Sequence, residues 1–130
     1  MNHNPVGWFE IYVQDMERAK AFYEGLFGVV LSKIQSEKLE QEKDHIEMWG
    51  FPMFPEGCGI SGALVRMAGF PSGANSVLVY FRCTDCAVEA SKVVQLGGRI
   101  QNEKFSISQY GYISHVIDTE GNMIGLHSMQ

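Results

Sequence analysis

The chain repeats one pattern at a constant spacing of 70 residues. A run of large residues, an Asp, an amphipathic segment and a glycine-containing ending occur in residues 7–30 and again in residues 77–100. The two copies align Asp15 with Asp85, Leu26 with Leu96, and Gly28 with Gly98. Two copies of one strand–helix–strand unit predict a duplicated fold with a pseudo-two-fold axis. In such a fold the cavity shared by the copies is the natural place for a ligand.

Length and charge limit the class of protein. The 130 residues predict a single domain that can bury a core. The net charge is −5 and no basic block occurs, so we expect no nucleic acid and no membrane as partners. No apolar stretch approaches the ~20 residues of a membrane span, and residues 1–5 lack the features of a signal peptide. Three cysteines are too few for a disulfide framework, which predicts a cytoplasmic protein.

In the first copy, alternating large side chains predict a strand over residues 8–13. One face of this strand carries Phe9, Ile11 and Val13, and the other carries Trp8, Glu10 and Tyr12. Asp15 is placed to cap a following helix and Gly28 to end it. The apolar stripe expected to be buried on that helix consists of Met16, Ala19, Phe22, Tyr23 and Leu26. Further strands are expected over residues 29–34, 45–49 and 59–67, with a charged connector over 36–44.

The second copy repeats this order after a linker. We expect module one over residues 1–68, the linker over 69–75 and module two over 76–130, all within the single domain 1–130. The strands of module two are predicted over residues 77–83, 99–104, 112–118 and 123–128, with a turn at 118–122. Thr84 or Asp85 would cap its helix, whose buried stripe would hold Ala87, Ala90, Val93 and Val94. The predicted fold class is α+β: two tandem βαβββ modules form a curved sheet around a cavity, with the helices on the outer face.

Three motifs resemble those of a known family. They are the segment from Val13 to Gly28, the Leu96-Gly97-Gly98 ending, and the closing segment from Asp118 to Leu126. They resemble the vicinal oxygen chelate superfamily, which includes glyoxalase I, bleomycin resistance proteins and extradiol dioxygenases. The resemblance covers essentially the whole chain. Its motifs are capping, packing and turn residues, so they indicate the fold and say little about the reaction.

The resemblance implies where a metal would be bound. The metal-dependent members place His and Glu ligands on the first and last strands of each copy. The corresponding positions here hold Trp8, Ala63, Leu78 and Gly125. None of these side chains can ligate a divalent metal. We therefore expect no metal at the family positions and no cofactor, which argues against glyoxalase I chemistry and extradiol cleavage. Bleomycin-resistance-like members work as metal-free binding proteins, and this chain is closer to them.

Strand parity predicts which side chains face the cavity. They are Trp8, Glu10 and Tyr12 from the first strand, Leu78, Tyr80 and Arg82 from the fifth, and Met123 and His127 from the last. We take Trp8, Tyr12, Tyr80, Arg82 and Met123 as candidate ligand-binding residues. A mostly aromatic lining with a few polar groups is typical of a small-molecule site.

Glu10 and His127 are the candidate catalytic residues. Desolvation between two aromatic side chains would favour the protonated form of Glu10 and suit a general base. Alternatively, Glu10 pairs with Arg82 or with a tyrosine hydroxyl and only shapes the pocket. His127 shares the strand face of the lost ligand position at Gly125, so it could bind a ligand, transfer a proton or join a displaced metal site. It could equally be a structural histidine.

Three functional hypotheses follow. The first is a metal-free domain that binds a small hydrophobic or aromatic molecule between its modules and forms a homodimer. The second is a lyase, isomerase or dioxygenase of the same fold. Its rearranged metal site would draw on Glu10, Glu47, His115 and His127, or on His45 beside Glu47. The third is a structural or regulatory module whose cavity is filled by Trp8 and Tyr80.

Two further features stay open. The Cys83-Thr-Asp-Cys86 motif permits a redox role, but it lacks the sequence context of thioredoxin-like motifs. The apolar loop at residues 51–55, together with Phe70 and Pro71, would cover the cavity, pack a dimer partner or pack on its own chain.

Overall fold

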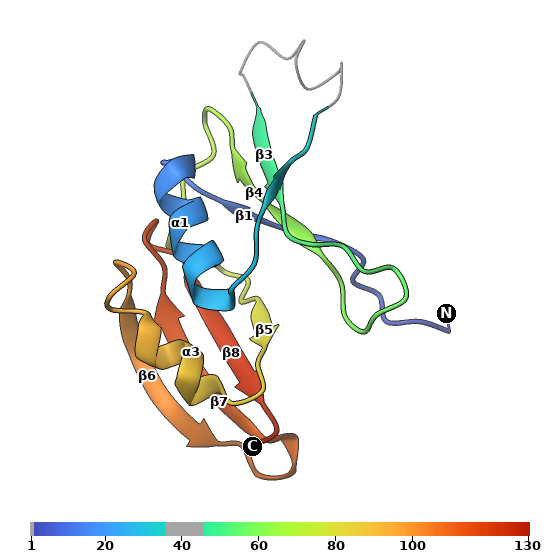
Figure 1. Cartoon of the computed structure of the whole chain (residues 1–130), viewed down its shortest axis with the longest axis vertical. Coiled ribbons are helices and arrows are strands. Elements are labelled where there is room, and N and C mark those ends of the chain that lie inside the picture. The colour runs from blue at the N-terminus through green and yellow to red at the C-terminus, as the bar shows by residue number, and fades with distance from the viewer. Residues whose placement is uncertain (1, 36–45) are drawn as a thin grey trace.

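The computed structural model describes residues 2–35 and 46–130, and the expected connector and His45 lie outside them. The fold is α+β, with two four-stranded mixed sheets and the helices α1 and α3 packed on them (Figure 1). The fold class is therefore confirmed. In the part of the chain that the structure describes, no helix is long and apolar enough to cross a membrane.

The first sheet is built by the N-terminal half of the chain. Its elements are β1 (Phe9–Tyr12), α1 (Met16–Phe27), β2 (Ser32–Lys33), β3 (Glu47–Gly50) and β4 (Gly62–Arg66). The strand order is β1-β4-β3-β2, with β1 parallel to β4 and the other pairs antiparallel.

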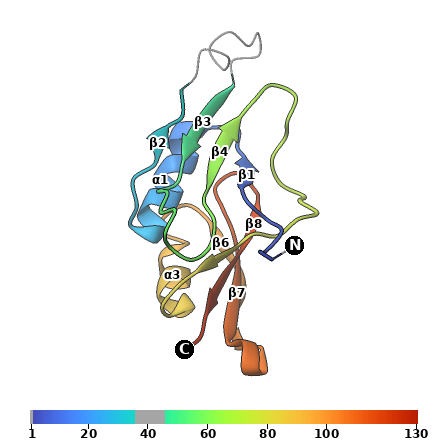
Figure 2. The same cartoon turned by 90° about the vertical axis from the view of Figure 1, so that its right-hand side faces the viewer.

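The second sheet repeats this topology. Its elements are β5 (Tyr80–Arg82), α3 (Cys86–Lys92), β6 (Arg99–Ser106), β7 (Tyr112–Ile117) and β8 (Met123–Ser128), with a short 3₁₀ helix at Ser108–Tyr110. The strand order is β5-β8-β7-β6, and β5 is parallel to β8. The curved surface thus consists of two hydrogen-bonded sheets, with β1 and β5 at their edges (Figure 2).

The register confirms the repeat seen in the sequence. Glu10 on β1 pairs with Ala63 on β4, and Tyr80, 70 residues after Glu10, pairs with Gly125 on β8. Ala63 and Gly125 therefore occupy equivalent positions in the two sheets.

The helix signals are largely confirmed. The side chain of Asp15 accepts a hydrogen bond from the Arg18 N–H, and Gly28 ends α1 in the left-handed conformation with φ 64°. The whole predicted stripe of α1 is buried. Asp85 caps α3, whose expected stripe was partly wrong: Ala87 and Val94 are exposed. Helix α3 ends at Lys92, so Val94 falls in the turn that follows it rather than on a helical face.

Aromatic side chains from both modules share one core beneath α1. Phe81 of β5 stacks on Phe27 with ring centroids 4.5 Å apart and meets Phe9 edge-on at 5.7 Å. Tyr23 of α1 and Phe51 of the apolar loop pack against the same Phe81 ring. Phe51 is buried, so this part of the loop packs on its own chain. The two modules are therefore joined by a common core.

A polar turn of the second module completes the junction. The Glu120 side chain accepts hydrogen bonds from the backbone N–H groups of Gln14 and Asp15, each at 2.8 Å, and from Arg18 Nε at 2.7 Å. Burial opposes ionisation of Glu120, but the hydrogen bonds from Arg18 and the backbone outweigh it. The pKa of the Glu120 carboxyl therefore lies below its ordinary value.

The turn at residues 118–122 also accepts a hydrogen bond from a buried tyrosine hydroxyl. Tyr23 Oη donates a hydrogen bond of 2.6 Å to Asp118 Oδ2, and Asn122 Nδ2 donates one of 2.9 Å to the Tyr12 carbonyl. Burial raises the pKa of Tyr23 well above its usual range, so its hydroxyl remains a donor. Burial also raises the pKa of Asp118, an effect its hydrogen bonds only partly offset.

The lowered pKa of Glu120 predicts a specific dependence of stability on pH. Its stabilising contribution is complete above the pKa of the unfolded carboxyl and is lost as pH falls through the lower folded pKa. Between pH 7 and pH 3, the Glu120→Gln variant should therefore lose less unfolding free energy than the wild type. At pH 7 we expect it to be less stable by about 1–3 kcal/mol, because charged hydrogen bonds are lost. Urea unfolding at both pH values measures this.

The exposed Glu103 on β6 provides the matched control. Glu103→Gln should change the unfolding free energy by less than about 0.5 kcal/mol. Equal pH dependence in the wild type and Glu120→Gln would contradict the assigned role of Glu120.

Candidate functional site

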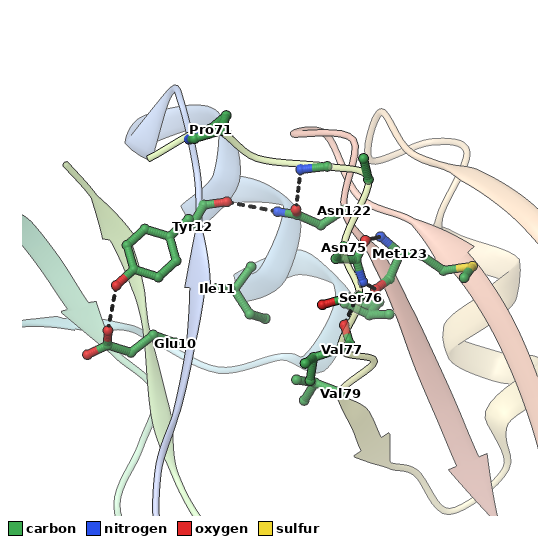
Figure 3. Close-up of a pocket in the computed structure, with 13 residues that line it drawn as sticks. Glu10, Ile11, Tyr12, Pro71, Asn75, Ser76, Val77, Val79, Asn122 and Met123 are labelled. Carbon is green, nitrogen blue, oxygen red and sulfur yellow. Dashed lines mark hydrogen bonds between the residues drawn. The ribbon is translucent and has the colours of Figure 1, made fainter. Parts of the chain in front are cut away.

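A cavity lies between the two modules. Its volume is about 380 Å³, within the range of roughly 300–1,000 Å³ usual for small-molecule sites. It is lined by Glu10, Ile11, Tyr12, Pro71, Gly73, Ala74, Asn75, Ser76, Val77, Val79, Asn122, Met123 and Ile124. Figure 3 shows Glu10 and Tyr12 of β1 on one side and Asn75, Val77 and Met123 on the other. The cavity is neither filled nor lined by Trp8 and Tyr80, so the third hypothesis loses its basis.

Glu10 is held by its neighbours on the same face of β1. Trp8 Nε1 donates to Glu10 Oε2 at 3.3 Å, and Tyr12 Oη donates to Glu10 Oε1 at 2.9 Å. The pairing with a tyrosine hydroxyl is the one observed. Glu10 is exposed, so the desolvation expected from the sequence is absent. Burial, followed by the bond to Glu10, raises the pKa of Tyr12, which keeps its hydroxyl protonated. The Tyr12 ring stacks on Phe70 at 5.1 Å.

The connection between the modules forms one wall of the cavity. Asn75 Nδ2 donates to the carbonyls of Val77 at 2.7 Å and Met123 at 3.1 Å, and Asn75 Oδ1 accepts from the Met123 N–H at 3.1 Å. Asn122 Oδ1 accepts from the Gly73 N–H at 2.6 Å. The segment at residues 69–75 was predicted to be a linker, and its place in the cavity lining was not predicted. The sequence signal that could have indicated this is Asn75, a side chain with both hydrogen-bond donors and an acceptor, in a segment that connects the two modules across the shared cavity.

The remaining predicted residues lie on the exposed face of the second sheet. Tyr80 Oη lies 2.8 Å from His115 Nε2, and Asn102 Nδ2 lies 2.9 Å from His115 Nδ1. His115 therefore faces the same side as Tyr80, which the sequence left undecided. His127 Nε2 donates to the Tyr110 carbonyl at 2.6 Å. Arg82 on β5 lies opposite His127 on β8 in the strand register. Arg82 makes no ion pair with a residue that the structure describes.

The predicted site is thus divided between two places. Glu10, Tyr12 and Met123 line the cavity. Trp8 is not in the lining, but its indole N–H donates a hydrogen bond to Glu10. Tyr80, Arg82 and His127 lie on the second sheet, outside the cavity lining. The catalytic and binding roles assigned to these residues stay predictions.

The Cys83–Cys86 motif is poorly suited to redox chemistry. Burial, reinforced by the negative charge of Glu89, raises the pKa of Cys83 to about 12. Its thiol is therefore protonated at neutral pH, whereas the thiolate is the reactive form. Cys86 is fully buried at the start of α3.

Comparison with known proteins decides the family. The model of the Glyoxalase/Bleomycin resistance protein/Dioxygenase superfamily matches residues 6–126. The chain belongs to this superfamily. A comparison with curated proteins gives no match.

Solved structures share this superfamily's fold. Glyoxalase I from Zea mays is 18% identical with a TM-score of 0.70, over 96% of this chain and 46% of the maize chain. This chain thus spans about half the length of the maize enzyme. TnmS3, an antibiotic binding protein from Streptomyces sp. CB03234, is 25% identical with a TM-score of 0.65, over 98% of both chains. Glyoxalase I from Leishmania major is 17% identical with a TM-score of 0.69, over 98% of this chain and 88% of that one.

The positions that the family resemblance assigns to metal ligands do not fit a metal in this chain. Trp8 donates its indole N–H to Glu10, and Ala63, Leu78 and Gly125 offer no ligating side chain. The Tyr80 ring covers Gly125: a Cβ built there would lie 2.2 Å from Tyr80 Cδ1.

Two of the residues proposed for a rearranged metal site, Glu10 and Glu47, lie on opposite faces of the first sheet. Glu10 is bound by Trp8 and Tyr12, whereas Glu47 accepts from Trp49, whose ring lies under Lys20 of α1 on the helix side of the sheet. Across residues 2–35 and 46–130, no group of three or more His, Cys, Asp or Glu side chains is placed to hold a metal ion.

The contact between Tyr80 and Gly125 yields a test. Gly125→Ala should displace the Tyr80 ring and destabilise the protein by about 1–3 kcal/mol, because the new methyl group overlaps the ring. In a Tyr80→Ala background the same change should cost much less, since the ring is gone. A double-mutant cycle by urea unfolding measures the difference. Additive effects would show that Tyr80 does not cover Gly125.

Proposed function

We propose that this protein binds a small hydrophobic or aromatic molecule in the cavity between its modules, in the cytoplasm, without a metal at the superfamily positions. The observation that carries the proposal is a cavity of about 380 Å³ in a chain whose four metal-ligand positions hold no ligating side chain. Binding alone needs a shaped and partly apolar cavity, whereas the metal-dependent reactions of the superfamily need those ligands.

The lining supports this class of ligand. Ile11, Val77, Val79, Met123 and Ile124 supply apolar surface, and Glu10 with Tyr12 supplies a polar end. TnmS3 is an antibiotic binding protein, and its similarity to this chain covers 98% of both chains, which supports a binding function. No contact in the described chain favours the metal-dependent lyase, isomerase or dioxygenase, so we do not propose it.

Elemental analysis followed by ligand screening tests the function. Protein purified without metal-affinity steps should contain far less than one equivalent of Zn, Ni, Fe or Mn. Adding these metals should not raise its melting temperature. A library of small aromatic molecules should contain compounds that do raise it, because a ligand that binds only the folded state stabilises that state. Stoichiometric metal, or the absence of any stabilising compound, would overturn the proposal.

We also propose that the protein is a homodimer. Several apolar side chains near the apolar loop are exposed: Met53 is 53% exposed, Phe54 77% and Ile60 46%. An interface between copies would remove such surface from water. Phe51 from the same loop is buried, so the loop is anchored while its tip is presented outward.

Sedimentation velocity tests the assembly. The wild type should sediment with twice the 14.6 kDa chain mass, and Phe54→Ser should shift it toward the monomer because apolar interface area is lost. Val94→Ser, at a 65% exposed position after α3, is the matched control and should stay dimeric. A monomeric wild type would contradict this proposal without affecting the binding function.

A further inference from the structure

The cavity has an uncompensated negative charge. Glu10 is the one charged side chain among the described residues that line the cavity, and no Lys, Arg or His shares that lining. Glu10 also makes no ion pair with any residue of the described part. A fixed charge at the mouth of a partly apolar cavity attracts a ligand of opposite sign.

The other polar groups of the cavity are largely occupied. Asn75 is bound to the backbone of Val77 and Met123, and Asn122 to the backbone of Gly73 and Tyr12. The Tyr12 hydroxyl donates its hydrogen bond to the Glu10 carboxylate. Each Glu10 oxygen accepts one hydrogen bond, from Trp8 or from Tyr12, and keeps further acceptor capacity. The side chains that can still bind a ligand are therefore the Glu10 carboxylate and the Ser76 hydroxyl, and only the carboxylate is charged.

The position of this carboxylate is organised before a ligand arrives. Trp8 and Tyr12 hold its two oxygens from either side along β1, and Tyr12 is itself stacked on Phe70. Because the group is held in place, less conformational entropy is lost when a ligand binds it. The aromatic rings beside it also suit a cation, which is attracted to their faces. Across the cavity, Val77 and Val79 provide an apolar wall, whereas the Met123 side chain points away from Glu10 (Figure 3).

We infer that the ligand of this cavity carries a protonated amine that pairs with Glu10 and an apolar or aromatic body that lies against the wall formed by Val77 and Val79. This inference rests on the proposed binding function and names its ligand class. The rival class is an anionic ligand held by Arg82 and Tyr80. That pair lies outside the cavity lining, so the geometry favours the amine.

Three probes of one shape test the inference. They are 1-naphthylmethylamine, which is cationic at pH 7, the neutral 1-naphthalenemethanol and the anionic 1-naphthoate. Isothermal titration calorimetry should show the amine binding about three- to tenfold more tightly than the alcohol, with the carboxylate weakest. The preference for the amine should shrink as NaCl is raised, because salt screens an exposed ion pair.

Variants assign the preference to Glu10. In Glu10→Gln, which keeps the size of the side chain, the amine and the alcohol should bind equally. Glu103→Gln, which removes an exposed charge on β6, should keep the full preference. Circular dichroism and thermal unfolding check that both variants are folded. If Glu10→Gln does not fold, the salt dependence measured on the wild type decides the question.

The outcomes separate this inference from the proposed function. Equal affinity for amine and alcohol, or an amine preference that survives in Glu10→Gln, overturns the amine class while small-molecule binding stands. Tightest binding of the carboxylate, lost in Arg82→Gln, assigns the rival class. If none of the three probes binds, the inference fails; the proposed function fails only if the wider aromatic library also yields no ligand.

Discussion

The structure depends on one carboxylate that reaches from the second module into the first. Glu120 accepts the backbone N–H groups of Gln14 and Asp15, at the point where β1 gives way to α1. A helix start leaves such donors unpaired, and an acidic side chain three residues after the cap often satisfies them. That position here is Arg18, which instead binds Glu120. A helix cap and the joint between the modules are thus the same interaction.

The cavity follows from this joint. Asn122, in the same turn as Glu120, binds both the Tyr12 carbonyl and the Gly73 N–H. The turn therefore sets the distance between β1, which carries Glu10, and the connection that forms the opposite wall. These contacts join one side chain of a short turn to backbone groups of β1 and of the connection, so they fix the shape of the site. Its chemistry is left to the few side chains that line the cavity.

The second sheet shows how an aromatic ring occupies the position at which the family resemblance places a metal ligand. At Gly125 the aromatic ring of Tyr80 takes the space above the strand, and the Tyr80 hydroxyl meets His115 instead. Glycine is needed there because any Cβ would overlap the ring. The strand pairing is unaffected, since register depends on backbone hydrogen bonds. The superfamily architecture is thus kept, while the positions that the family resemblance assigns to metal ligands hold no ligating side chain.

The sequence by itself determined the duplication, the caps at Asp15 and Gly28, the buried stripe of α1 and the face of β1 that carries Glu10. These features depend on residues close together in the chain, whose periodicity and turn chemistry are local. It misjudged the stripe of α3, whose helix ends earlier than its apolar pattern.

Only the tertiary structure decided that Glu120 holds Gln14 and Arg18, that His115 meets Tyr80, and that the linker at Asn75 is a wall of the cavity. Those contacts join residues 35 to 106 positions apart or depend on how two modules pack. Sequence periodicity does not predict that packing. It predicts which face of a helix or strand carries a side chain, but not which residue of the other module packs against that face.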